Sequence, residues 1–161
     1  MGNFTWDYKV LQPSDLPKKA QRFIEIMEID TMGLKLMLLT KNPNGKFVKG
    51  FDILEEKKPY GKWAAVAEFE AIYFFDEYTK VKTAIHELTH IYFSQAKFFK
   101  GIEYDFMTIA EKFISQHGRN ALTNYAQISI FEDEWEEVVC EIIATYGRKG
   151  QFNKIKELLN Q

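Results

Sequence analysis

The chain has 161 residues and a formal net charge of −2, with 46% hydrophobic and 27% charged residues. This composition predicts a single folded domain over residues 1–161 and excludes an extended disordered chain. A charge so close to zero gives no general attraction for nucleic acid or anionic lipid, so we expect neither as a partner.

The first residues lack the positively charged start and apolar core of a signal peptide, and no apolar run is long enough to cross a bilayer. We therefore expect a cytoplasmic protein without membrane association. The chain has one cysteine, Cys140, so no internal disulfide can form.

The N-terminal part of the chain predicts one helix and a small β-sheet. Ser14-Asp15-Leu16-Pro17 is a helix-start pattern, and the apolar stripe after it predicts a helix over 15–28. Two strands, 34–40 and 46–53, flank the turn sequence Asn42-Pro43-Asn44-Gly45 and predict a hairpin. The β-branched and aromatic run 66–75 predicts a further strand.

The rest of the chain predicts helices, over 79–97, 104–116, 132–146 and 151–159. Gly118 follows the helix over 104–116 and Gly147 closes the helix over 132–146. Glycine suits the left-handed conformation common at helix ends. The expected class is α+β, with a small N-terminal sheet packed on a mostly helical C-terminal half.

The helix predicted over 79–97 carries the motif H-E-x-x-H, formed by His86, Glu87 and His90. Residues four apart on a helix differ by about 40° around its axis, so both imidazoles share one face. Glu87 can reach a water molecule held between them. Two histidine ligands, a carboxylate base and a water are the core of a zinc hydrolase site, so we expect Zn²⁺ as cofactor.

A catalytic zinc ion needs a third protein ligand, which must come from another element. His117 is one candidate, but it falls in the loop expected to end a helix. The acidic helix over 132–146 is the other source. Its first acids, at positions 132, 133, 134 and 136, crowd the helix start, where acids usually face water.

Glu137 and Glu141 differ from these acids because apolar residues surround them. They are four residues apart, hence on one face, and a carboxylate in a buried segment needs a metal or a polar partner. One of the two can be the third ligand, and the other can accept a hydrogen bond from a ligating imidazole. Cys140 between them is expected to be a buried apolar residue.

The motif together with this later Glu-x-x-x-Glu helix resembles the gluzincin metallopeptidases, most closely small phage-associated and toxin-like members of the lethal-factor type. The resemblance implies a zincin-like fold, with Glu137 as third zinc ligand and Glu141 supporting a ligand histidine. Tyr125, in Tyr125-Ala126, would stabilise the oxyanion. The gap from Tyr125 to Glu137 is longer than in the family; taking Glu132 as ligand restores the gap but loses the apolar spacing.

These features predict a zinc-dependent metallopeptidase that hydrolyses peptide bonds of a narrow protein or peptide substrate, with Glu87 as general base for a zinc-bound water. The substrate would pair in extended form with the edge of the strand before the motif helix. Two alternatives remain: a non-catalytic zincin-fold binding or regulatory protein, and a helical interaction protein with a structural zinc or no metal. Glu87 favours the enzyme, because a structural site needs no base.

Overall fold

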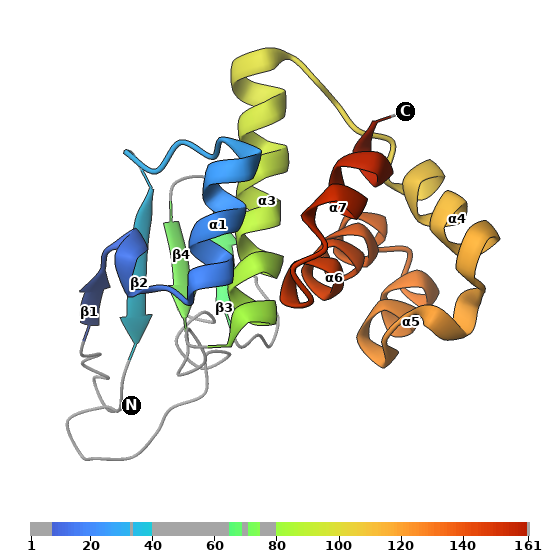
Figure 1. Cartoon of the computed structure of the whole chain (residues 1–161), viewed down its shortest axis with the longest axis horizontal. Coiled ribbons are helices and arrows are strands. Elements are labelled where there is room, and N and C mark those ends of the chain that lie inside the picture. Colours follow the sequence, from blue (N-terminus) through green and yellow to red (C-terminus); the bar gives the residue numbers. More distant parts are fainter. Residues whose placement is uncertain (1–7, 33, 40–64, 69–70, 75–79, 161) are drawn as a thin grey trace, which may run out of the picture.

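The computed structural model describes residues 8–32, 34–39, 65–68, 71–74 and 80–160, which are mostly helical and include one small sheet. In chain order the elements are β1 (Tyr8–Leu11), η1 (Pro13–Asp15), α1 (Lys18–Met27), β2 (Lys35–Leu39), β3 (Ala65–Glu68), β4 (Ala71–Phe74), α3 (Val81–Lys100), α4 (Phe106–His117), η2 (Arg119–Ala121), α5 (Asn124–Phe131), α6 (Trp135–Arg148) and α7 (Phe152–Leu159). Figure 1 shows α3 between the sheet with α1 on one side and helices α4 to α7 on the other. Within the described residues, no helix is both long and apolar enough to cross a bilayer.

The four strands form a mixed sheet in the order β1-β2-β4-β3. The outer strands β1 and β3 each run antiparallel to their neighbour, whereas β2 and β4 run parallel. Leu11, Leu36 and Ile72 are paired across three adjacent strands, and all three side chains are buried. Because side chains on a strand alternate between its faces, this row marks the face of the sheet that meets the core.

Two predicted strand arrangements are wrong. The run 66–75 is not one strand: β3 and β4 are two antiparallel strands in which Glu68 pairs with Ala71. The predicted hairpin paired 34–40 with 46–53; residues 46–53 lie outside the described residues, and β1 and β4 occupy both edges of β2. A hydrophobic run identifies a strand but not its partner, and here one partner, β1, comes from a distant part of the chain.

Most helices lie where the sequence predicts them, with ends that differ by a few residues. Gly101 ends α3 in the left-handed conformation. Gly118 follows α4 with a φ of +85° but a ψ of 156°, so it is not the left-handed cap that the sequence predicts, and Gly147 lies inside α6 rather than closing it. The helix predicted over 132–146 begins only at Trp135, because residues 132–134 form a turn in which Asp133 has a φ of +60°. The sequence does not predict α5, which precedes this turn.

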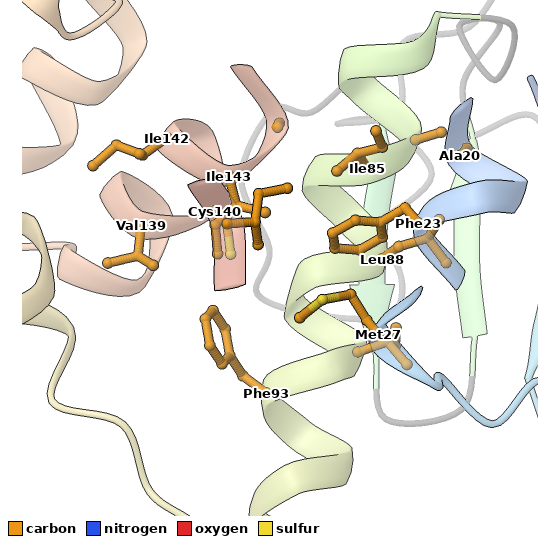
Figure 2. Packing of buried hydrophobic residues seen from close by; sticks show 14 of the residues in the cluster. Ala20, Phe23, Met27, Ile85, Leu88, Phe93, Val139, Cys140, Ile142 and Ile143 are labelled. Carbon is orange, nitrogen blue, oxygen red and sulfur yellow. The ribbon is translucent and has the colours of Figure 1, made fainter. Parts of the chain in front are cut away.

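α3 is the central element of the hydrophobic core. Figure 2 shows Ala20, Phe23 and Met27 of α1 facing Ile85 and Leu88 of α3, while α6 side chains approach α3 from the other side. Because α3 is covered on two sides, its buried face is wide and includes the region of the H-E-x-x-H motif. The packing of α3 on α6 therefore decides what the motif meets.

α6 comes very close to α3 at Gly147. A Cβ atom on Gly147 would lie 2.6 Å from Cδ1 and 3.2 Å from Cγ2 of Ile85, a residue that is fully buried. Glycine is therefore the residue that allows this approach without displacing Ile85. The approach sets how near the two helices can bring their polar side chains.

We expect Gly147→Ala to lower the free energy of unfolding by about 1–2 kcal/mol, since overpacking costs about 1–3 kcal/mol and alanine's helix propensity returns up to about 1 kcal/mol. Ile85→Val removes the Cδ1 atom that the new methyl group would meet. The double variant should therefore be less destabilised than the sum of the two single variants. Chemical denaturation measures all three, and strictly additive losses would contradict the close approach.

Candidate metal centre

Three side chains that the sequence proposes as metal ligands meet between α3 and α6: His86, His90 and Glu137. Their potential ligand atoms all lie within 4.8 Å of one another. Nε2 of His86 is 3.0 Å from Oε1 of Glu137, and Nε2 of His90 is 2.7 Å from Oε2 of the same carboxylate. The Glu137 carboxylate thus lies between the two imidazoles and offers one oxygen to each.

The Nδ1 atom of each imidazole also lies within hydrogen-bonding distance of a second carboxylate. Nδ1 of His86 lies 3.2 Å from Oε1 of Glu141, and Nδ1 of His90 lies 2.7 Å from Oε2 of Glu136. A neutral imidazole that donates its Nδ1–H to such a carboxylate directs the lone pair of Nε2 toward the common centre. Both histidines therefore have the orientation that a metal ligand needs, and each would have the right tautomer once its Nε2 proton is lost.

Glu141 is itself held by two further groups. Nζ of Lys82 lies 2.9 Å from its Oε2, and the hydroxyl of Thr123 donates to the same oxygen at 2.8 Å. The Thr123 oxygen also caps α5 by accepting from the backbone N–H of Ala126 at 3.2 Å. Threonine before a helix is a recognisable cap signal, but its bond to Glu141 depends on how α5 packs on α6, and the sequence does not reveal it.

Glu87 and Tyr125 lie beside this cluster. Glu87 adjoins His86 in α3 and is 8% exposed. The hydroxyl of Tyr125 donates to Oε1 of Glu137 at 2.7 Å, and its ring meets the His86 ring edge-on with centroids 5.6 Å apart. Tyr125 is 42% exposed, so its phenol joins the cluster to the surface.

The ionisation of the cluster follows from burial and close charge pairs. Burial lowers the pKa of His86, but hydrogen bonds to Glu137 and Glu141 overcome this and raise it to about 9. Burial likewise lowers the pKa of His90, while the neighbouring Cys140 sulfur and then hydrogen bonds to Glu136 and Glu137 hold it well above its ordinary value. Burial raises the pKa of Glu141, and the contact with His86 brings it down to about 2. In the metal-free protein these contacts favour the protonated form of both imidazoles.

The charges of these contacts suit a divalent cation. Glu136, Glu137 and Glu141 supply three carboxylates and Lys82 supplies one ammonium, which leaves a charge of −2 for these four groups when the imidazoles are neutral. The buried Glu87 carboxylate beside His86 adds further negative charge. Buried charge has to be compensated. Two protons on the imidazoles offset two of these negative charges in the metal-free protein, and one divalent cation with two neutral imidazoles offsets the same number.

The other candidates for third ligand lie outside the cluster. His117, at the end of α4, stacks near Phe113 with ring centroids 4.7 Å apart. Glu132 is exposed at the end of α5. Glu141 contacts Nδ1 of His86 rather than the shared centre. Of the acids considered from the sequence, Glu137 is the one that the structure places between the two Nε2 atoms.

Glu136 is the cluster residue that sequence reasoning missed. The expectation that it faces water holds only in part: its side chain is 41% exposed, but α6 begins at Trp135 and its first turn brings the Glu136 carboxylate to His90. Cys140, one turn later, belongs with His90 and Glu136 to a second group that could hold a metal ion. Burial raises the pKa of the Cys140 thiol to about 12, which matches the predicted buried, neutral cysteine.

Comparison of the chain with models of protein families, with curated proteins and with solved structures finds no match.

The metal-free protein should be most stable between about pH 4.5 and pH 6.5. His86 has a pKa raised from 6.5 to about 9, so its contribution is complete below 6.5 and is lost as the pH rises through 9. Glu141 has a pKa lowered from 4.5 to about 2, so its contribution is complete above 4.5 and is lost as the pH falls through 2. Melting temperatures of chelator-treated protein across pH measure this window.

Added zinc should restore the thermal stability that the metal-free protein loses at alkaline pH. Metal binding displaces the imidazole protons, so it strengthens as the pH rises. His117→Gln serves as the control, since this histidine lies outside the cluster and should leave the profile unchanged. A flat profile for wild-type protein between pH 6.5 and pH 9 would contradict the proposed imidazolium–carboxylate pairs.

Elemental mass spectrometry should find about one zinc per chain in wild-type protein and none in Glu137→Ala, since two histidines alone bind zinc weakly. Glu136→Gln and Glu141→Gln should keep the three ligands but weaken zinc binding by about 10- to 100-fold, because the imidazoles lose their carboxylate acceptors. Glu132→Ala is the matched control and should bind zinc normally. Zinc lost in Glu132→Ala but kept in Glu137→Ala would overturn this ligand set.

Proposed function

We propose that this protein is a zinc-dependent metallopeptidase of the gluzincin type, with a zincin-like fold and a narrow range of protein or peptide substrates. The observation that carries the proposal is the Glu137 carboxylate between Nε2 of His86 and Nε2 of His90, with Glu87 beside them. Two histidines and a glutamate are a ligand set of catalytic zinc sites, which leave one position for water. A structural zinc has four protein ligands and needs no neighbouring base.

Zinc held by these three residues would lower the pKa of a water molecule toward about 7 and polarise the substrate carbonyl. Glu87 takes a proton from that water as the water adds to the carbonyl carbon, and then delivers a proton to the leaving amine. The hydroxyl of Tyr125, which donates to Glu137 in the metal-free protein, would turn from Glu137 to the carbonyl oxygen as negative charge develops there. Burial, together with the Glu137 carboxylate, holds the pKa of Tyr125 well above its usual range, so the phenol keeps its proton.

The position of β3 supports an extended peptide as substrate. β3 is an outer strand of the described sheet and contacts α3, the helix that carries Glu87. An extended segment can add to such a strand through backbone hydrogen bonds. A peptide paired in this way would lie alongside the motif helix, which is where its carbonyl has to be presented.

Glu87→Gln should retain zinc but lower hydrolysis of a fluorogenic peptide library by about 10²- to 10⁴-fold, because the amide cannot accept the proton. Tyr125→Phe removes a single donor and should lower the turnover number by about 10- to 100-fold with little change in zinc content. His117→Gln is the control and should keep full activity. Zinc in wild-type protein without any hydrolysis would instead support the non-catalytic binding or regulatory protein.

A further inference from the structure

α5 carries apolar side chains on both of its faces. Ala126 is buried against the core, whereas Tyr125, Ile128 and Phe131 are 42%, 59% and 90% exposed. A surface helix normally has one apolar and one polar face, and a helix that is apolar all round is normally buried. α5 therefore presents an apolar face that the described part of the chain leaves open.

This open face begins at the metal cluster. Tyr125 hydrogen-bonds Glu137 at 2.7 Å. Ile128 follows it by three residues, which on a helix means about 4.5 Å along the axis and about 60° around it. Phe131 follows by the same step. Because Thr123 ties the start of α5 to Glu141 at 2.8 Å, the face has a fixed position relative to the cluster.

The far end of the face is acidic. Glu132, Asp133 and Glu134 follow Phe131 directly and are exposed. The backbone N–H of Glu132 donates to the carbonyl of Ile128 at 3.0 Å, so this acidic turn is held against α5. Among the residues that the structure describes, none of the three acids forms a salt bridge.

We propose that this α5 face and the acidic turn 132–134 form the wall of the active site that selects the substrate. The wall receives an extended peptide with an aliphatic or aromatic side chain against Ile128 and Phe131 and a lysine or arginine toward the acids. Charge complementarity favours a cationic segment, and the same acids repel an anionic membrane surface. The proposal rests on the peptidase function and names the class of peptide that this site takes.

Three labelled hexapeptides test the wall by fluorescence anisotropy on Glu87→Gln protein, which cannot turn them over efficiently. The first has two central leucines flanked by lysines, the second replaces the lysines with glutamates, and the third replaces the leucines with serines. Binding is measured with and without added zinc, at low and high salt. The lysine–leucine peptide should bind tightest, by about tenfold or more over either reference peptide, and should weaken with salt because exposed charges are screened.

Variants distinguish binding at this wall from non-specific binding to exposed apolar side chains. Ile128→Ser with Phe131→Ser should weaken the lysine–leucine peptide by about tenfold, and Glu132→Gln with Glu134→Gln should remove most of its salt dependence. Phe99→Ser is the control, since Phe99 is 64% exposed on α3 but lies nine residues beyond His90. Circular dichroism and melting temperature establish that each variant is folded.

Equal binding of the three peptides, no binding of any of them, or an equal loss in Phe99→Ser would overturn the wall. Selective binding that is lost only in the α5 and acidic-turn variants would establish it. Hydrolysis is scored separately on wild-type protein with the same peptides. Selective binding without hydrolysis would support the proposed peptide-binding wall and contradict the peptidase function. Hydrolysis without the expected selectivity would support the peptidase function and contradict the wall.

Discussion

The candidate site depends on one carboxylate, that of Glu137, being held between two imidazoles. Its two oxygens lie 3.0 Å and 2.7 Å from the Nε2 atoms of His86 and His90, which come from a different helix. This arrangement requires α3 and α6 to pack closely and in a fixed register. Gly147 and Ile85 provide the close approach, and the apolar residues around them supply the free energy that offsets burying polar groups.

The groups around this carboxylate are organised so that the imidazoles are oriented before any ligand arrives. Glu141 and Glu136 occupy the Nδ1 atoms of His86 and His90, so each Nε2 is turned to the shared centre. Lys82 stabilises Glu141 from outside the cluster. Protons and a divalent cation compete for the same excess of negative charge, which is why metal binding and protonation have to be linked in this protein.

α5 connects the site to the surface. Its cap residue Thr123 bonds to Glu141 and its first-turn residue Tyr125 bonds to Glu137, so the helix is fixed at two points of the cluster. The same helix leaves Ile128 and Phe131 exposed and ends in the acidic turn. A short helix thus links the groups proposed for chemistry with the groups proposed for selecting a peptide.

The chemical types at the site follow from the sequence alone, because the spacing of His86 and His90 on one helix puts both imidazoles on a common face, with Glu87 next to them. The sequence also singled out the pair Glu137 and Glu141, since carboxylates among apolar residues need partners. Which of these two glutamates lies between the histidines depends on the register of α6 against α3, so the sequence leaves it open and the folded structure resolves it.

The tertiary structure also decided the contact of Glu136 with His90, the place of α5 and the strand order β1-β2-β4-β3. Local patterns fix which residues share a face of a helix or strand, since periodicity is a property of a few successive residues. Which faces meet is set by packing between segments far apart in the chain, and a local pattern carries no information on it.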